Sequence, residues 1–419
     1  MTQPPDKVRS LQEKLYVAAK AKSTRRFGTI RDRVTRWDVM VQAWEEVRRN
    51  RGAPGVDGVT IGAVEGQGVE AFLRELQDQL RDGTYRPLPV RRVTIPKRSG
   101  GQRVLGIPAV RDRVAQAAVK LVIEPIFEAD FLPCSYGYRP GRSAQDAARE
   151  VWKWLNRGLE NVLDADIKAC FDEIPHDRLL SAVARRISDG SVLRLVRMWL
   201  KSGVLVGGGV ETTEKGTPQG GVLSPLLANI YLHRLDAEWR RRGLAHRYGV
   251  SAKLIRYADD FVIMSSHSVR PLVPIVREVL TDMGLTLNVE KSRVVRAEKG
   301  FDFLGFRFVC RYSQRHGRRR AYFFPSPDAV KRVKEKVLKR CGNNMLHVEV
   351  RNVVRSVNNV LRGWWAYYRC SNASHTFHGV QVYANHRMRR FLRRRKKKTG
   401  LGRYRDYNDE YMYNELGLV

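Results

Sequence analysis

The chain has 419 residues and is 43% hydrophobic, which is enough for a packed core and for two or three domains. It carries 77 Lys and Arg against 43 Asp and Glu, and this net charge of +34 indicates a nucleic-acid partner, as for a ribosomal or histone-like binder. Five scattered cysteines without a CxxC pair argue against a disulfide framework and a zinc ribbon. No apolar run reaches the roughly 20 residues that span a bilayer, and "MTQPPDKVRS" lacks a signal core. We therefore expect a cytoplasmic protein with no membrane partner, nucleoid-associated when it acts on DNA.

Hydrophobic periodicity and turn residues predict an α+β architecture up to about residue 310 and helices from about residue 326 onward. The segment 85–108 has β-prone flanks around the Gly-Gly turn of "RSGGQ", which predicts a hairpin. "LIRYADDFVIM" predicts two strands joined by a tight turn. The remaining predicted elements are helices within 8–50 and at 69–83, 112–131, 176–187 and 220–239, a strand at 161–167, a helix and then a strand within 272–292, a strand at 300–309, and helices at 327–341, 347–369 and 378–397.

Adjacent aspartates at the predicted tight turn are the first candidate site. Asp259 and Asp260 occupy its tip, and Asp164 and Asp166 share one face of the strand "NVLDADI" by its period of two. If the tip adjoins the end of that strand, Asp166, Asp259 and Asp260 repel one another unless cations lie between them. Two Mg²⁺ ions about 3.5–4 Å apart would relieve the repulsion and support an in-line phosphoryl displacement. A solvated Asp-Asp turn is the alternative for the dipeptide alone.

The flanks of these aspartates resemble a known family. "LIRYADDFVIM" resembles motif C of reverse transcriptases, and "DIKACFD" resembles their motif A. The resemblance implies that the carboxylates of Asp166, Asp259 and Asp260, with the backbone carbonyl of Ile167, bind the two Mg²⁺ ions. It also implies that Phe171 is the steric gate that selects deoxynucleotides, for which an ordinary core Phe is the alternative.

Four further blocks stand in the order that reverse transcriptases have. "IPKRSGGQRVLGIP" resembles the fingers hairpin, "GTPQGGVLSPLLANI" motif B, "LTLNVEKSR" motif D and "FDFLGF" the primer-grip hairpin. In motif D, Lys291 would approach the pyrophosphate as a general acid, and Asn288 would order the loop. A basic surface hairpin and a simple helix entry are the alternatives for the first two blocks. The residues implied for nucleotide binding are Lys97, Arg103, Gln219 and Gly220, and those implied for the primer grip are Phe303, Leu304 and Gly305.

The resemblance narrows to the reverse transcriptases encoded by group II introns. "VQAWEEVRRNRGAPGVDGVTI" is similar to their N-terminal extension and first block, and "VNNVLRGWWAYYRCSN" to their thumb, or maturase, domain. This implies a right-hand polymerase with fingers and palm, followed by an all-α thumb. We expect no HNH endonuclease, because its Cys pairs and His ligands are missing, so the chain looks like the bacterial group IIC type. The expected domains are an RNA-binding extension at 1–60, fingers and palm at 61–312, a thumb at 313–398 and a tail at 399–419.

The predicted thumb combines aromatic and basic residues. "GWWAYY" puts Trp364, Trp365, Tyr367 and Tyr368 on one helix, where helical spacing divides them between faces and some must pack in the core. "RRFLRRRKKK" predicts a basic stripe, for which a solvated face is the alternative. Beside a polymerase palm, we expect such residues to contact phosphates. The residues expected to bind RNA or DNA are Arg362, Arg369, Arg389, Arg390, Arg393, Arg394, Arg395, Lys396, Lys397 and Lys398.

The sequence therefore predicts an RNA-directed DNA polymerase that copies intron RNA and assists its splicing and mobility, as the resemblance implies. Its expected partners are the group II intron RNA, an RNA template with a DNA primer, target DNA and dNTPs, and a homodimer is left open. Two alternatives stay open. One is a domesticated relative that serves defence, DNA repair or a CRISPR locus, and the other is a non-catalytic RNA-binding splicing factor.

Overall fold

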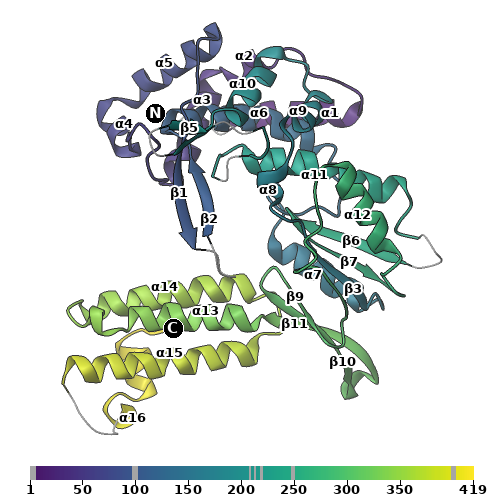
Figure 1. The fold of residues 1–419 in the computed structure, drawn as a ribbon. Helices are drawn as coiled ribbons and strands as arrows, with labels where there is room; N and C mark the ends of the chain where they lie inside the picture. Colours follow the sequence, from purple (N-terminus) through teal and green to yellow (C-terminus); the bar gives the residue numbers. More distant parts are fainter. Residues whose placement is uncertain are drawn as a thin grey trace.

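The structure is a computed structural model that describes residues 6–96, 102–206, 209–211, 214–217, 220–246, 251–397 and 403–419. The predictions for Lys97, Gln219 and Lys398 lie outside these residues, and only the backbone of Arg103 is described. Fingers, palm and thumb follow one another in a C-shaped arrangement (Figure 1). Within the ranges described, no helix is long and apolar enough to cross a bilayer.

The N-terminal lobe, or fingers, folds around one buried helix, α6 (Val110–Glu128). Ala, Val and Ile residues are spread around α6, and even Asp112, Arg113 and Gln116 are buried, so the helix is buried nearly all round. α1 (Asp6–Ala21) and α3 (Trp37–Arg49) pack their apolar stripes against it, which confirms the helices predicted within 8–50. The other helices of this lobe are α2 (Arg31–Val34), α4 (Ile61–Gln67) and α5 (Val69–Asp82).

The predicted hairpin is present as β1 (Val90–Pro96) and β2 (Gln102–Ile107), paired antiparallel. Its base is anchored to α6 by Asp112, which accepts hydrogen bonds from the Tyr85 hydroxyl at 2.5 Å and the Leu88 amide at 3.0 Å. From there it projects toward the thumb (Figure 1). β4 (Val204–Val206) and β5 (Gly209–Glu211) extend the sheet beyond β1.

The palm is an antiparallel sheet of β6 (Ala252–Tyr257), β7 (Asp260–Ser265), β3 (Asn161–Asp166) and β8 (Arg293–Arg296), in that order. The first three strands are largely apolar because both of their faces are covered. α7 (Ala144–Leu155) packs on one face, and α9 (His176–Ala184), α11 (Ser224–Arg241) and α12 (Leu272–Asp282) pack on the other. The remaining helices are α8 (Cys170–Glu173) and α10 (Gly190–Leu200).

The strand predicted at the end of 272–292 is wrong. The chain there makes only an isolated bridge between Leu287 and Ile167, and β8 begins after it. Asn288 gives the physical reason, because its side-chain Oδ1 accepts from the Lys291 amide at 3.4 Å and turns the chain away from strand geometry.

A second antiparallel sheet links the palm to the thumb; its strands are β9 (Phe301–Phe303), β10 (Phe306–Ser313) and β11 (Arg318–Pro325). The single strand predicted at 300–309 is divided by a turn at Leu304 and Gly305, whose φ angles are +53° and +78°. Phe303 ends β9 and is buried. The domain change expected at residue 312 falls within β10, so this sheet is continuous across it.

Three helices form the thumb, which confirms the helices predicted at 327–341, 347–369 and 378–397. They share an aliphatic core, into which Met412 and Leu418 near the C-terminus also insert. The helices are α13 (Pro327–Arg340), α14 (Val350–Tyr368) and α15 (Ser374–Arg395), followed by the short α16 (Arg403–Asp406).

Candidate active site

The β6–β7 hairpin presents the adjacent aspartates. The facing pair Tyr257 and Asp260 closes a two-residue turn made of Ala258 and Asp259. Ala258 has a φ of +56°, which is uncommon for a residue with a Cβ. In the register between β7 and β3, Asp260 lies directly opposite Asp166. The turn tip and the strand end therefore adjoin, as the resemblance to motifs A and C implies.

The three strand carboxylates share one face of the palm sheet. Val162 and Val262 pack into the apolar cluster that contains α7, β9 and β10, while the alternate residues face α11. Because strand side chains alternate, Asp164, Asp166 and Asp260 lie on the face of Val162 and Val262. This face is turned toward the thumb side of the molecule.

The carboxylates crowd one another. Asp260 is exposed as a residue at the end of its strand, but its carboxylate is partly desolvated by the surrounding protein. This desolvation first, and then the charges of Asp259, Asp166 and Asp164, raise the pKa of Asp260 from 3.8 to about 7, against an opposing effect of Lys291. Burial also raises the pKa of Asp164. Such a cluster destabilises the folded chain by itself, and oxygen-ligated divalent cations are the groups that would neutralise it.

The loop after α12 supplies polar partners for Asp166. Lys291 Nζ lies 3.3 Å from Oδ2 of Asp166, and Asn288 donates from Nδ2 to the same oxygen at 2.9 Å. The Asp166 amide donates to Ser292 Oγ at 3.3 Å. Asn288 thus orders the loop and contacts the carboxylate, and Lys291 lies beside the same carboxylate.

The ligand geometry differs from the expectation in one respect. Across the part of the chain that the structure describes, no three Asp, Glu, His or Cys side chains stand close enough together to hold a metal ion. Asp166 is engaged by Asn288 and Lys291 instead. The residues still fit divalent cations, because carboxylate oxygens are hard ligands and the raised pKa of Asp260 marks charge that a cation would neutralise.

Asp260→Asn should stabilise the protein in the absence of divalent ions. The pKa of Asp260 in the folded protein is about 7, above the ordinary 3.8. Below about pH 4 the side chain is neutral and does not reduce the free energy of unfolding; as the pH rises through 7 it becomes charged in the folded protein, and the free energy of unfolding falls. Because Asp260 is an exposed residue, solvent screens these charges, and we expect a gain of only about 1 kcal/mol in the free energy of unfolding at pH 8 and a smaller gain at pH 5. Thermal unfolding in a chelator at the two pH values measures it. A variant less stable than wild type at pH 8 would contradict this account.

Phe171 lies close behind the strand end, in α8. Ala169, with a φ of +45°, turns the chain into this helix, and Phe171 is 9% exposed. Its carbonyl accepts from the Thr217 amide at 2.7 Å. A Cβ on Gly216 would stand 2.9 Å from the carbonyl oxygen of Asp172, so only glycine allows this approach. The start of motif B therefore rests directly on motif A.

Motif B also touches the fingers hairpin. A Cβ on Gly220 would stand 2.7 Å from the carbonyl oxygen of Gly106 in β2, and Gly220 has a φ of +126°. Arg103 lies on the same strand, opposite Ile95. The two segments implied for nucleotide binding are therefore neighbours through Gly220.

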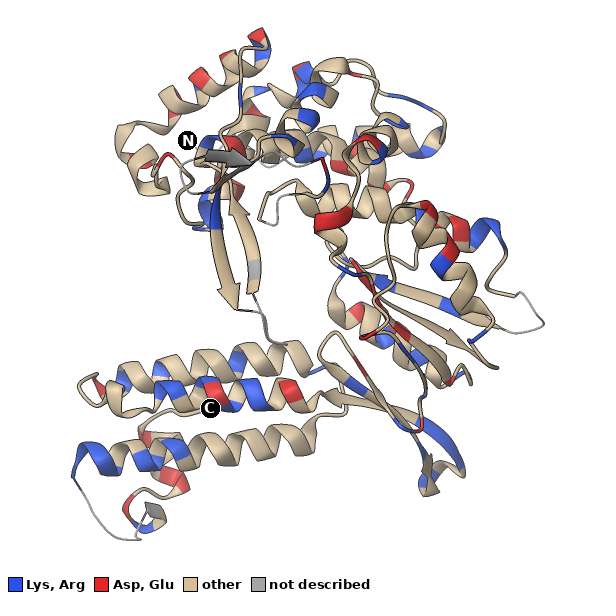
Figure 2. Ribbon diagram, in the orientation of Figure 1, with Lys and Arg blue, Asp and Glu red and all other residues tan. Residues whose placement is uncertain are grey.

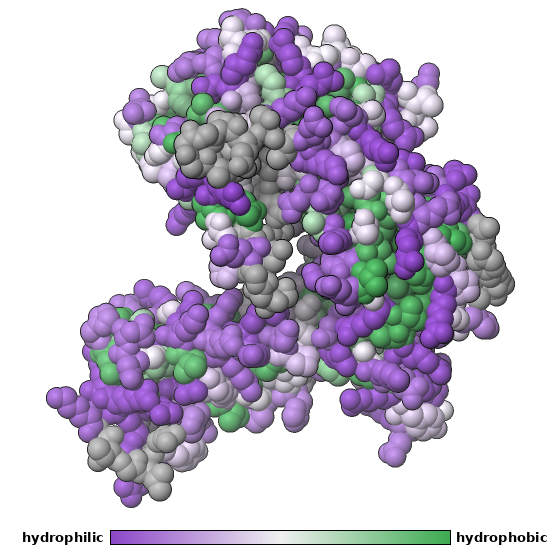
Figure 3. Space-filling model, viewed as in Figure 1, coloured by the Kyte–Doolittle hydropathy of each residue, from purple (hydrophilic) through white to green (hydrophobic). Residues whose placement is uncertain are grey.

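The β9–β10 turn is held by the thumb. Tyr367 Oη donates to the Leu304 carbonyl at 3.1 Å, and a Cβ on Gly305 would stand 2.9 Å from Tyr368 Oη. Figure 3 shows the surface hollowed between fingers and thumb. A groove of about 830 Å³ runs from Asp260 past this turn to α13 and α14. The cationic residues on its thumb wall are Arg332, Lys336 and Arg340.

The predicted basic stripe on α15 is divided by the structure. Arg389 and Arg393 are 9% and 6% exposed and pair with Asp409 and Asp406. These two arginines hold the C-terminal residues on α15, so the expectation of one continuous stripe is wrong at their positions. Arg394 is partly buried, and the exposed members of the predicted set are Arg362, Arg369, Arg390, Arg395, Lys396 and Lys397.

The aromatic residues of "GWWAYY" are packing residues. Tyr368 meets Phe306 edge-on at 5.0 Å between ring centroids, and Trp364 meets Phe377 edge-on at 5.4 Å. They join α14 to β10 and α15, so the alternative of helix-packing aromatics is confirmed for these two.

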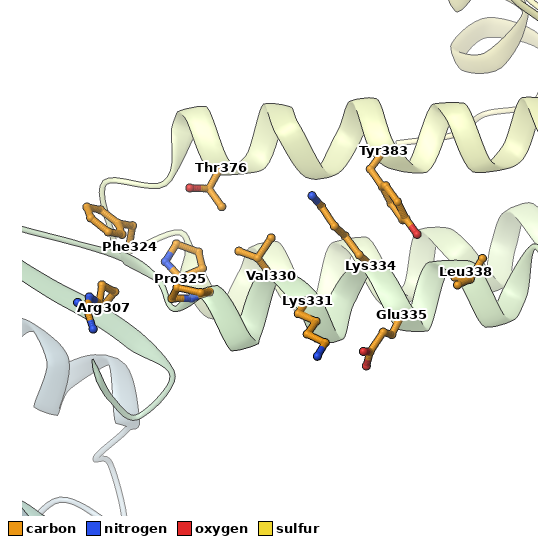
Figure 4. Close-up of a pocket in the computed structure, with 11 residues that line it drawn as sticks. Arg307, Phe324, Pro325, Val330, Lys331, Lys334, Glu335, Leu338, Thr376 and Tyr383 are labelled. Atoms are coloured by element: carbon orange, nitrogen blue, oxygen red, sulfur yellow. The ribbon is translucent and has the colours of Figure 1, made fainter. Parts of the chain in front are cut away.

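A second groove, of about 660 Å³, lies between α13 and α15 (Figure 4). Val330 and Leu338 line it, and Lys334 Nζ lies 5.4 Å from the ring centroid of Tyr383. None of the described residues that line this groove is an aspartate, so it is separate from the carboxylates of the palm.

Comparisons with known proteins assign the family. The family model for reverse transcriptase (RNA-dependent DNA polymerase) matches residues 95–308, and that for the group II intron maturase-specific domain matches residues 330–411. The chain belongs to the reverse transcriptases encoded by group II introns. This group II intron reverse transcriptase is therefore an RNA-directed DNA polymerase, from a family that generally uses divalent metal ions.

Individual relatives agree with this group II intron assignment. Protein YkfC of Escherichia coli K12 is 34% identical over 343 residues, which cover 73% of this chain and 90% of YkfC. Group II intron-encoded protein LtrA of Lactococcus lactis is 39% identical over 200 residues, or 48% of this chain and 33% of LtrA. A Candida albicans telomerase solved with a fragment of telomeric RNA has a TM-score of 0.44 at 14% identity, over 83% of this chain and 67% of the telomerase chain, too weak a likeness to carry an argument.

Several residues at the site of this reverse transcriptase were not predicted from the sequence. Arg293 Nε lies 3.2 Å from Oδ2 of Asp164, so this aspartate is paired with a cation from β8. Ser292 and Tyr367 hold backbone groups of Asp166 and Leu304. The string "EKSR" at the end of motif D carried the signal for Arg293 and Ser292, because it places polar residues directly after Asn288 and Val289.

Proposed function

We propose that the protein copies intron RNA into DNA at the site of Asp166, Asp259 and Asp260, and helps that RNA to splice and to move. The register that sets Asp260 opposite Asp166, beside the Asp259 turn, carries the proposal. These carboxylates and the Ile167 carbonyl would hold two divalent ions. When bound, such ions activate the attacking 3′-hydroxyl and neutralise the leaving pyrophosphate.

The chain's own side chains position the reactants in this proposal. Lys291, whose ammonium group lies 3.3 Å from Asp166, gives a proton to the leaving pyrophosphate. Phe171 excludes a ribose 2′-hydroxyl from the nucleotide site. The groove between Asp260 and the thumb takes the primer, which would be a nascent strand of the target DNA.

The thumb and residues 1–60 bind the intron RNA in this proposal. Arg351, Arg355 and Arg362 line a pocket of about 230 Å³ along α14. Basic positions also gather at the C-terminal end of α15, shown in blue in Figure 2. Guanidinium groups spaced along a helix suit the phosphates of a folded RNA.

Two assays test the proposed function. The protein should extend a DNA primer on an RNA template with Mg²⁺, lose this activity in a chelator, and accelerate splicing of the intron RNA that surrounds its gene. Assisted splicing without primer extension would favour the non-catalytic splicing factor. Primer extension without any intron RNA to bind would favour a domesticated enzyme.

Removing the three arginines of the α14 pocket should weaken RNA binding and its salt dependence. For Arg351→Ala/Arg355→Ala/Arg362→Ala, we expect the magnitude of the slope of log affinity against log salt to fall by about 2–3. The reason is that fewer counterions are released from the RNA when the protein makes fewer phosphate contacts. The matched control is Arg270→Ala/Arg277→Ala, which removes exposed arginines from the palm. Equal slopes for both variants in a filter-binding titration would refute a specific role for the pocket.

A further inference from the structure

A completely buried arginine lies behind the β6–β7 turn of Ala258 and Asp259, called here the catalytic turn. Arg256 is 0% exposed and stands in β6, three residues before Asp259. Leu254, two residues earlier, packs in the cluster that contains α11, whereas Ile255 packs in the cluster with α7. By the alternation of the strand, Arg256 therefore lies on the sheet face opposite to the face that bears Asp260.

Five hydrogen bonds match the five N–H donors of this guanidinium group. Nε and Nη2 donate to the two carboxylate oxygens of Asp236 in α11, at 2.8 and 2.5 Å. Nη2 also donates to Ser135 Oγ at 2.8 Å, and Nη1 donates to Asn229 Oδ1 at 3.1 Å. The fifth bond runs from Nη1 to the carbonyl oxygen of Ala258 at 3.0 Å, inside the catalytic turn itself.

The same turn is confined by the segment that follows α6. The Tyr136 amide donates to the Arg256 carbonyl at 2.8 Å, and Asn229 donates to the Gly137 carbonyl at 2.7 Å. A Cβ on Gly137 would stand 2.5 Å from the amide nitrogen of Ala258. The turn is therefore fixed between a glycine backbone and a buried cation.

We propose that Arg256 is a positioning residue for polymerisation: by binding the Ala258 carbonyl it fixes the catalytic turn and so sets where the Asp259 carboxylate stands. The need is physical, because Ala258 holds a φ of +56°, a strained conformation for a residue with a Cβ, and the surrounding contacts must hold it there. Lys could not replace Arg256, since one ammonium group with three donors cannot serve Asp236, Asn229, Ser135 and Ala258 together. This inference rests on the proposed role of Asp259.

Arg256→Lys keeps a positive charge and removes the planar guanidinium group with its five donors. We expect kcat for primer extension to fall roughly 10–100-fold and the Mg²⁺ concentration for half-maximal rate to rise severalfold, with the affinity for template–primer unchanged. The matched control is Arg186→Lys, which alters another buried arginine, 3% exposed and paired with Asp130 at 3.4 Å, remote from the turn. It should lose thermal stability without the change in kcat and Mg²⁺ dependence.

Gly137→Ala supplies a second route if Arg256→Lys does not fold. The added methyl group presses on the turn from the other side and leaves the ion pair intact, so the same kinetic change should appear. Unaltered kcat and Mg²⁺ dependence in either folded variant, or equal effects in Arg186→Lys, would overturn the positioning role. Asp259→Ala separates the proposed polymerase site from the positioning role of Arg256. If Asp259→Ala still extends primers, the proposed site is wrong. If Asp259→Ala is inactive while Arg256→Lys has normal kinetics, only the positioning role is wrong.

Discussion

Replacing Asp259 by alanine should abolish primer extension, with a rate at least about 10³-fold below wild type. The side chain stands at the tip of a turn that abuts the end of β3, where its carboxylate is one of three that would share the divalent ions. Losing one oxygen ligand removes transition-state stabilisation worth several kcal/mol. Single-turnover extension of a DNA primer on an RNA template, at saturating Mg²⁺ and dNTP, measures the loss.

Asp164→Asn is the matched control for this variant. Asp164 lies on the same strand face as Asp166, but it is paired with Arg293 and faces Val262 across the sheet rather than an aspartate. We expect its rate to stay within about tenfold of wild type, because an exposed or half-exposed ion pair contributes little. Full activity in Asp259→Ala, or equal losses in both variants, would contradict the assignment of the ligands.

Replacing Phe171 by valine should let the enzyme incorporate ribonucleotides. The ring stands behind the end of β3 in α8, and the Thr217 amide binds its carbonyl, so both motif A and motif B fix its position. Shortening the side chain opens space for a 2′-hydroxyl, and we expect the preference for dNTP over rNTP to fall about 100-fold. The measurement is kcat/KM for dTTP against UTP on one template.

Phe127→Val tests whether this effect is only a loss of packing. Phe127 is a core residue in α6, 4% exposed, and its truncation should cost about 1–3 kcal/mol of stability, as that of Phe171 should. Its preference for dNTP over rNTP should stay at the wild-type value. If Phe171→Val also kept that preference, Phe171 would be an ordinary core residue.

Much of the site could be predicted because its chemistry is local. The alternation in "NVLDADI" already puts Asp164 and Asp166 on one face, and the tight turn puts Asp259 and Asp260 at a tip. The pairing of β3 with β7 is not local, because it depends on the packing of helices against both apolar faces of the sheet. That step came from the resemblance to a family and not from the residue pattern.

The unpredicted features depend on distant contacts. Arg389 and Arg393 stand in a run of basic residues that resembles an exposed stripe, and only the returning C-terminal residues bury them. Arg256 gives no sign of burial in the sequence, because its partners come from three separate segments. α7 is different: Ser143 and Asp146 form a capping box at its start, a local signal that could have identified this helix.

Diffraction from a complex with RNA template, DNA primer, dNTP and Mn²⁺ tests the shared-cation account most directly. Anomalous scattering locates each Mn²⁺ ion independently of the protein. We expect two ions bound by the carboxylates of Asp166, Asp259 and Asp260, with Lys291 displaced from Asp166. Mn²⁺ found only elsewhere, with Asp166 still paired to Lys291 in the presence of primer and nucleotide, would contradict it.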